Sequence, residues 1–323
     1  MAFIPSLFTV ITNSQAFPMI DYAKIEISPD AAAYLFSCNE LSFERYRNED
    51  TAEQTHSMPR VAKYEGMEFY YYPSGRMTLH GSWHKYYCGG RNHSDFSLAQ
   101  FQCALIQFCR NLKVGPDELK ILQLEFGVNI PPPIAPQQVI DALVGNGKGN
   151  GFSEMRTNKG RSIGVNMYLT NYGVKIYDKG AQYKLPYPVL RIEKKYLNWC
   201  KYRSAFGIYT MADLISPNAW AALCDDLLNT VGQLVIKEPS LEFDLMTLKE
   251  KYVVTQAADA KWWKSIPPKK RLAAKKKCDR LLDKYGWYSL HGELMNCMTA
   301  KMHYLLSDDN KSGMFSIETA PSD

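Results

Sequence analysis

The stretch SIGVNMYLTNYGVKIYDKG, residues 162–180, decides how the first half of the chain folds. Apolar and polar residues alternate on both sides of Asn171–Gly173, which predicts two strands joined by a hairpin turn. The run VLRIEKKY, residues 189–196, predicts a further strand directly after it. Several short alternating runs joined by tight turns are typical of a β-sheet rather than of a helical bundle.

The region upstream continues this pattern. Strands are predicted from IDYAKIEIS (residues 20–28), from the two halves of MEFYYYPSGRMTLHGSWHKYY (67–87) and from LEFGVNI (124–130). Pro73, Ser74 and Gly75 supply turn chemistry between the two halves. The stretch 96–112 repeats apolar residues at helical spacing, which predicts one long helix. The first two hundred residues are therefore predicted to form an α+β domain.

The character of the chain changes after about Trp199, where helical patterns replace strands. Ser216 and Pro217 give an N-cap and first-turn signal before an apolar stripe, and further helices are expected downstream. We predict a possible N-terminal extension at residues 1–18, an α+β domain at 19–200, and a mainly helical region at 201–323 that ends in a disordered tail.

Composition restricts the classes of protein that the chain can represent. Its 323 residues include 38 Lys and Arg against 33 Asp and Glu, and 21 tyrosines. Cations and rings together suit nucleic acid, although a tyrosine-rich core explains the rings equally well. Eight cysteines without a CxxC pair indicate reduced thiols. Because no run of 18 apolar residues exists, we expect a cytoplasmic protein that does not insert into membranes.

The first candidate site is TLHGSWHKYY, residues 78–87. On an extended strand, His80, Ser82 and His84 point to one side. The α-carbons of the two histidines would then be roughly 13 Å apart, at a rise of about 3.3 Å per residue. Both can bind one metal ion only if the strand bends between them. The alternative is a histidine on a half-exposed strand without a ligand role.

Carboxylates on two apolar strands form the second candidate site. Glu125 and Asn129 share one face of LEFGVNI, and a carboxylate there is costly unless it is paired or bound to an ion. Glu193 follows Arg191 on the strand at 189–196, and its alternative role is pairing with Arg191 or a lysine. Oxygen and imidazole ligands together favour Mg²⁺ or Mn²⁺ over a structural zinc.

Tyr177 is the candidate nucleophile. It ends a predicted strand, and Lys179 lies two positions further on, where it would share the same face. A tyrosine hydroxyl has a pKa near 10, so attack on phosphate requires a cation that favours the anion or a group that removes the proton. The alternative is a tyrosine that only packs in the strand.

A third feature is a strongly basic helix near the C-terminus. The stretch PPKKRLAAKKKCDRLLDKYG, residues 267–286, carries six cations within nine positions: Lys269, Lys270, Arg271, Lys275, Lys276 and Lys277. These residues form either a solvated helix face or a face that binds phosphates. Trp262 and Trp263 lie just upstream and favour DNA, since rings beside cations suit unstacked bases.

The order of these motifs resembles a known family. HGSWHKYYCGGRNHSDF, then LEFGVNI, VKIYDKGAQY and LRIEKKY, follow one another as in the replication initiators of filamentous phages and small rolling-circle plasmids. Those proteins are distant members of the HUH endonuclease superfamily. The resemblance covers about residues 19–240 and implies an HUH-like, antiparallel-sheet nuclease domain at 19–200, followed by a helical region that holds DNA.

The resemblance also implies roles for individual residues. Tyr177 would attack one strand of a plasmid or phage origin, with Lys179 beside it, and would keep the 5′ phosphate as a phosphotyrosine. The metal ligands would come from Glu125, Glu193, Asn129, His80 and His84. Ser82 and Lys85 match a GS-x-x-K element and, with Arg191, would contact DNA. The spacing of the two histidines departs from the His-hydrophobic-His pattern of the superfamily.

The expected function is therefore a nickase that initiates rolling-circle replication. Its expected cofactor is Mg²⁺ or Mn²⁺ and its substrate is single-stranded or hairpin origin DNA, with host helicase and polymerase as further partners. Two alternatives remain open from the sequence. A relaxase for plasmid mobilisation uses the same chemistry, and a non-catalytic origin-binding protein keeps the basic helix without a metal ion.

Overall fold

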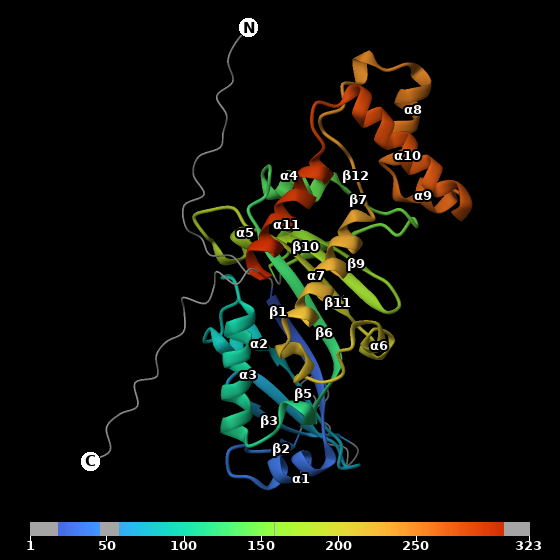
Figure 1. Ribbon diagram of the computed structural model, residues 1–323. Helices are drawn as coiled ribbons and strands as arrows, with labels where there is room; N and C mark the ends of the chain where they lie inside the picture. Colours follow the sequence, from blue (N-terminus) through green and yellow to red (C-terminus); the bar gives the residue numbers. More distant parts are fainter. Residues whose placement is uncertain (1–18, 46–57, 158, 307–323) are drawn as a thin grey trace.

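The computed structural model describes residues 19–45, 58–157 and 159–306 (Figure 1). The predicted N-terminal extension and the predicted disordered tail lie outside the described residues. One ten-stranded sheet forms the centre, in the order β2-β3-β4-β5-β1-β6-β11-β10-β9-β8. Its strands are β1 (Met19–Ile27), β2 (Glu44–Arg45), β3 (Arg60–Tyr64), β4 (Met67–Tyr71), β5 (Met77–Ser82), β6 (Leu119–Ile130), β8 (Ser153–Arg156), β9 (Ser162–Tyr168), β10 (Tyr172–Asp178) and β11 (Leu190–Tyr196).

Each neighbouring pair in this sheet is antiparallel, which confirms the predicted α+β class. The two predicted hairpins are also confirmed. Gly75, with a φ of +82°, makes the turn between β4 and β5, a backbone conformation that suits glycine. β9 and β10 pair with Tyr168 opposite Gly173, so their turn is at residues 169–171 and not at the predicted Asn171–Gly173, of which Tyr172 and Gly173 already belong to β10. Both turns return the chain within a few residues, so each pair of strands lies side by side.

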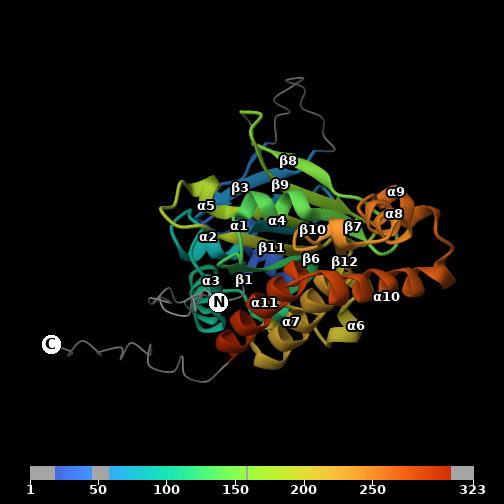
Figure 2. The same cartoon turned by 90° about the horizontal axis from the view of Figure 1, so that it is seen from above.

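Helices cover one face of the sheet: α3 (Leu98–Leu112), α7 (Pro217–Gly232) and α11 (Leu290–Leu306) lie together on that side (Figure 2). The rings of Phe126 on β6 and Trp220 on α7 meet at 5.9 Å, and Phe101 on α3 approaches the same Trp220 ring to 5.7 Å. The sheet and these three helices share one hydrophobic core. This core therefore crosses the predicted boundary near residue 200.

The remaining helices are short or belong to a C-terminal unit. The short ones are α1 (Pro29–Ser37), α2 (Trp83–Tyr87), α4 (Pro136–Ala142), α5 (Lys179–Tyr183) and α6 (Arg203–Phe206). The C-terminal unit comprises α8 (Leu248–Ala257), α9 (Ala260–Ser265) and α10 (Pro268–Tyr285), which project away from the sheet (Figure 1). A small pair of strands, β7 (Leu143–Asn146) and β12 (Leu234–Ile236), lies close to this unit. Among the described residues, no helix is both long and apolar enough to cross a membrane.

A β-bulge in β1 shapes the centre of the sheet. Ile20 pairs with Phe126 and Ala23 with Leu124, so two residues of β1 stand opposite the single residue Glu125 of β6. The extra residue lets neighbours in sequence project to the same side of the sheet. Asp21 therefore projects to the face of Glu125, while Ile20 and Ala23, which flank the bulge, stay in the core.

Candidate functional site: a buried charged cluster on the sheet

The sheet face opposite α3, α7 and α11 is polar, and strand register decides which side chains meet on it. Across β10, β11 and β6, three rows of residues lie side by side. The rows are Gly173–Lys195–Glu125, Lys175–Glu193–Gly127 and Tyr177–Arg191–Asn129. Because side chains alternate along a strand, all nine positions belong to the same face. The sequence predictions for Glu125, Asn129, Tyr177, Arg191 and Glu193 thus converge on one region.

We call eight of the residues in this region the charged cluster: Asp21, Asn92, Glu125, Lys175, Tyr177, Lys179, Arg191 and Glu193. Arg191 lies at its centre and is fully buried. The guanidinium donates to Asp21 Oδ2 at 2.9 Å and to the Asn92 carbonyl at 2.7 Å, and its Nε lies 2.6 Å from Glu193 Oε1. A buried guanidinium needs such partners, since its charge cannot be neutralised by losing a proton.

These contacts show the roles of two residues, Arg191 and Glu193, for which the sequence analysis had stated expectations. Arg191, which the sequence placed among the DNA-binding residues, is an internal ion-pair partner with no exposed surface. The alternative role of Glu193, pairing with Arg191 or a lysine, is confirmed. Burial opposes ionisation of Asp21, but Arg191, Ser82 and Lys179 outweigh it and lower the pKa of this carboxyl. The centre of the cluster is therefore ionic.

Tyr177 is part of this network. Its hydroxyl donates a hydrogen bond of 3.1 Å to Glu193 Oε1, and the residue is 6% exposed. Burial, and then the charge of Glu193, raise the pKa of Tyr177 well above its usual value. At rest the phenol is therefore neutral and faces a carboxylate that accepts its hydrogen bond. The sequence predicted the residue but not this partner.

The sequence suggested that Lys179 shares the strand face of Tyr177, but Lys179 lies outside that strand. Asp178 caps a new helix by accepting from the Ala181 amide, and Lys179 is the first residue of that helix, α5. Its buried Nζ still lies 5.5 Å from the Tyr177 ring centroid and 4.8 Å from that of Tyr183. Burial, and then Arg191, lower the pKa of Lys179 to about 7. The ammonium therefore stays close to the phenol, but from the end of the strand.

Asn92 holds this end of the cluster together. Its Oδ1 accepts from Lys179 Nζ at 2.9 Å and from the Tyr183 hydroxyl, and its Nδ2 donates to Asp21 Oδ2 at 2.8 Å. With the carbonyl that Arg191 uses, this one residue joins α5, β1 and β11. Asn92 belongs to the segment between α2 and α3, and that segment therefore fastens to the polar face of the sheet.

The other end of the cluster holds Lys175 and two carboxylates, with Lys195 beside them. Lys175 Nζ lies 2.8 Å from Glu125 Oε1 and 3.6 Å from Glu193 Oε2. Lys195 Nζ lies 3.0 Å from the same Glu125 oxygen. Burial opposes the charge on Lys175, but Glu193 and Glu125 raise its pKa above the usual value. The predicted acidic ligands are therefore already paired with cations of the chain.

The two histidines do not share a strand. β5 ends at Ser82, whose hydroxyl accepts from the Lys85 amide and caps α2, so His84 lies in the first turn of that helix. Burial lowers the pKa of His84 to about 3, and its ring stacks on Phe96 at 5.0 Å. His80 stays on β5, bonded to the Thr78 hydroxyl at 3.1 Å. The expectation of one common face was wrong because a cap interrupts the strand.

The predicted DNA contacts near these histidines also separate. The Ser82 hydroxyl donates to Asp21 of the cluster and accepts from the Lys85 amide, so it caps α2 and connects this helix to the cluster. Lys85, three positions on, is exposed and free to meet a ligand. Of this pair, Lys85 is exposed as a DNA contact requires, whereas Ser82 is half-buried and its hydroxyl already donates to Asp21.

A metal ion has no ready-made position among these side chains. Within the described residues, no three His, Cys, Asp or Glu side chains converge to hold an ion. Glu125 and Glu193 are paired with lysine and arginine, whereas His84 Nδ1 and Asn129 Oδ1 are buried without a hydrogen-bond partner in the described part of the chain. As arranged, the acidic pair does not fit a divalent ion, because an ammonium stands between its members. The expected Mg²⁺ or Mn²⁺ stays a prediction.

The basic residues of α10 divide into two groups. Lys269, Lys270, Lys276 and Lys277 are exposed. Arg271 donates to the Ile266 carbonyl at 2.9 Å and Lys275 to the Gly232 carbonyl at 2.8 Å, so both support the fold. Trp263 is buried and cannot stack on a base, although Trp262 is partly exposed. Four of the six predicted cations are therefore free to meet phosphates.

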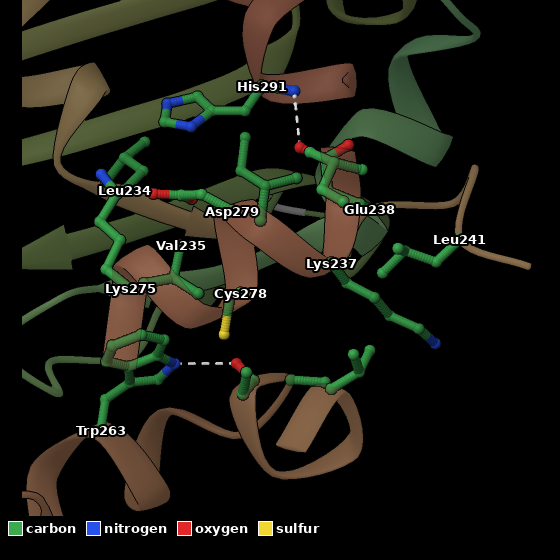
Figure 3. A pocket seen from close by; sticks show the side chains of 15 residues that line it. Leu234, Val235, Lys237, Glu238, Leu241, Trp263, Lys275, Cys278, Asp279 and His291 are labelled. Carbon is green, nitrogen blue, oxygen red and sulfur yellow. Dashed lines mark hydrogen bonds between the residues drawn. The ribbon is translucent and has the colours of Figure 1, made fainter. Parts of the chain in front are cut away.

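A cavity of about 80 Å³ lies between β12 and the C-terminal helices α8 to α11 (Figure 3). It is lined mainly by apolar side chains, and three of its polar lining residues make hydrogen bonds within the fold. Trp263 Nε1 donates to the Ala257 carbonyl, Glu238 accepts from the His291 amide, and Lys275 donates to Gly232. No member of the charged cluster lines it. This cavity is therefore separate from the candidate site.

Sequence reasoning missed three members of the cluster. Asp21 interrupts an apolar strand pattern, which was a signal of the same kind as the one that identified Glu125. Lys175 lies two positions before Tyr177 on one strand, so alternation alone placed it on that face. Asn92 had no signal, because it comes from a loop and reaches the sheet only in three dimensions.

Comparison with known proteins gives a distant likeness. No family model and no curated protein matches the chain. Among solved structures, it is similar to a rolling circle replication initiator protein from Geobacillus stearothermophilus. The two sequences are 12% identical, the TM-score is 0.42, and the similarity covers 68% of this chain and 85% of that chain. A score this low leaves the function to be argued from the charged cluster itself.

Proposed function

We propose that this protein initiates rolling-circle replication by nicking one strand of an origin, with Tyr177 as the nucleophile. One observation carries the proposal: the Tyr177 hydroxyl donates to Glu193 within a cluster of buried cations. This is the pairing of a nucleophile with a proton acceptor and positive charge that attack on a phosphodiester requires. The order of the sequence motifs supports the same reaction.

The chemistry follows from the contacts. As the Tyr177 oxygen approaches phosphorus, its proton passes to Glu193, because burial and the neighbouring carboxylate keep the resting phenol neutral. The bond from phosphorus to the 3′ oxygen breaks, and the 5′ phosphate stays on Tyr177. The leaving 3′ oxygen takes up a proton from solvent water and becomes the hydroxyl that primes synthesis, while Glu193 returns the Tyr177 proton to solvent. The negative charge of a bound phosphate would favour the ammonium form of Lys179, whose pKa is lowered to about 7 in the free protein.

Access to Tyr177 is part of the proposal. With 6% of the residue exposed, a DNA backbone reaches the phenol only after neighbouring groups move. The Asn92 side chain holds its segment to α5 and β1 by hydrogen bonds. The ring of His93 also contacts Tyr183 of α5, and Asn129 donates to the His93 and Ser94 carbonyls. Release of this segment would uncover the end of the cluster that holds Tyr177. DNA bound along α10 would supply the binding energy for that step.

The substrate of this reaction would be single-stranded or hairpin origin DNA, because a tyrosine on a sheet face needs an unstacked backbone. Host helicase and polymerase would act after the nick. A divalent ion, Mg²⁺ or Mn²⁺, remains a proposed cofactor, and no step of the reaction above depends on it.

A second candidate function is origin binding without cleavage. The burial of Tyr177 favours this function, because a buried hydroxyl does not reach a phosphate. The exposed lysines of α10 also favour it, because they can bind DNA without cleaving it. One experiment separates the two functions. Labelled single-stranded oligonucleotides that tile the DNA around the gene are incubated with the protein and then denatured. A covalent adduct that Tyr177→Phe abolishes supports the nickase, whereas binding without adduct supports the second candidate.

A further inference from the structure

Lys175 has an unusual position between two carboxylates of neighbouring strands. Its Nζ lies 2.8 Å from Glu125 and 3.6 Å from Glu193, and 18% of its side chain is exposed. Glu193 leans over Gly127, where an added Cβ would stand 2.8 Å from the Glu193 Cγ. The glycine therefore provides the space in which the two carboxylates face the same ammonium.

Two carboxylates that lie close together in a buried region repel unless a cation lies between them. In proteins this cation is often a divalent metal ion, because carboxylate oxygens are hard ligands. Here the chain supplies the cations itself. Arg191 Nε lies 2.6 Å from Glu193 Oε1, and strand register fixes Lys175 opposite Glu193, where its ammonium contacts both carboxylates. A second ammonium, from Lys195, reaches the same Glu125 oxygen at 3.0 Å.

We infer that Lys175 is the built-in counter-ion of the Glu125–Glu193 pair and occupies the position that a divalent ion would otherwise take. A divalent ion then binds to the free protein only by displacing the ammonium. Lys175 thereby weakens the binding of a divalent ion at this carboxylate pair, whether or not the protein cleaves DNA. The inference concerns the metal affinity of the protein alone and stands independently of the proposed nicking.

The direct test measures Mn²⁺ binding to the full chain without DNA, by calorimetry and by the electron paramagnetic resonance signal of free Mn²⁺. Lys175→Met keeps most of the aliphatic stem and removes the charge. We expect Mn²⁺ to bind at least about tenfold more tightly to this variant than to the wild type, because the carboxylates no longer have the ammonium between them. Adding Glu125→Gln to the variant should remove the gain.

Two controls make the result specific. Lys63→Met removes a lysine that is 77% exposed and lies 3.6 Å from the partly exposed Glu68, so it should leave Mn²⁺ affinity unchanged. Lys175→Arg keeps a cation between the carboxylates and should also give no gain. Equal Mn²⁺ affinity in Lys175→Met and wild type would overturn the inference, as would a gain that Lys175→Arg shares.

A second measurement needs no variant and covers the case in which Lys175→Met fails to fold. Wild-type protein is treated with an amine-acylating reagent, and the modified lysines are quantified by mass spectrometry. Displacement predicts that saturating Mn²⁺ accelerates acylation of Lys175 while that of exposed Lys63 stays constant. An unchanged rate at Lys175 under saturating Mn²⁺ would contradict displacement. Neither measurement involves cleavage, so a failed nicking assay leaves this test intact.

Discussion

Asn92 and Lys179 are 87 positions apart in the chain, and the amide oxygen of one accepts a 2.9 Å hydrogen bond from the buried ammonium of the other. The same amide also donates to Asp21. One neutral side chain thus compensates a buried cation and a buried anion together, and it fastens a loop to the end of the sheet where Tyr177 lies.

Asn92→Ala should therefore destabilise the protein strongly. It leaves the Lys179 ammonium without its acceptor, and an unsatisfied buried group costs about 1–3 kcal/mol. Asp21 also loses one of its three donors and keeps Arg191 and Ser82. Urea denaturation followed by circular dichroism measures the loss. Asn111→Ala is the matched control, because Asn111 makes one exposed hydrogen bond to Tyr64. Equal losses for the two variants would show that Asn92 does not fasten the loop.

Replacement of Arg191 by methionine should cost more than any surface ion pair. It removes the central cation and leaves Asp21 and Glu193 buried together, a loss of about 3–5 kcal/mol in the free energy of unfolding. Arg76→Met, which breaks an exposed pair with Glu26, should cost less than about 1 kcal/mol. Denaturant midpoints of the two variants give the comparison.

Tyr177, rather than Tyr172 or Tyr183, should carry the covalent DNA. The ring of Tyr172 packs against Lys194 at 4.5 Å, and Lys194 bonds Thr230 of α7 on the helix-covered face. Peptide mapping of the adduct identifies the residue. Tyr177→Phe should reduce adduct formation by at least about a thousandfold, with DNA affinity nearly unchanged. Tyr172→Phe is the control, and adduct found on that residue would refute the assignment.

Neutralising the exposed lysines of α10 should weaken DNA binding and its salt dependence. The variant replaces Lys269, Lys270, Lys276 and Lys277 by glutamine. For every phosphate that these lysines neutralise in the wild type, the slope of log K against log salt should fall by roughly one. Arg271 and Lys275, which bond backbone carbonyls, supply the comparison: their replacement should lower stability and leave the slope intact. An unchanged slope in the fourfold variant would show that these four lysines face solvent and do not contact DNA phosphates.

The pH dependence of stability should report Lys179. Its pKa is about 7 in the folded protein and near 10.4 when unfolded, so the unfolded state binds more protons between these values. Stability contributed through this group therefore rises as pH increases from 7 to 10, by up to a few kcal/mol. Lys179→Met should lose that rise. The unfolding free energy of wild type minus variant, measured at pH 6 and pH 10, checks the sign.

Local pattern was enough to predict the elements of this fold. The buried residues Phe101, Leu105, Phe108 and Leu112 repeat at helical spacing in α3, and turn residues separate the hairpin strands, so each signal lies within one short stretch. These local signals were enough to predict the class of the fold and four of the strands that form the polar face. The bulge in β1 could not be predicted from them, because an extra residue in a ladder depends on the partner strand.

The pairing of side chains across strands was harder to predict than the strand on which each side chain lies. Alternation placed Glu125 and Asn129 on one face of their own strand, but which residues of other strands they would meet depended on strand order in the sheet. Lys175 was overlooked because a lysine on a half-exposed strand usually faces solvent. His84 was placed on a strand because the capping role of Ser82 depends on an amide three residues later, which spacing alone does not reveal.

The bulge at Asp21 and Tyr22 also affects which changes of chain length this strand tolerates. Deleting Tyr22 would restore an ordinary ladder in which Ile20 and Ala23 keep their places in the core and Asp21 keeps its side of the sheet. Where the ladder is regular, as across Lys194 in β11, a deletion would turn the residues on one side of the gap to the opposite face. The bulge is thus a point in the central strands where evolution can remove a residue without inverting the sheet.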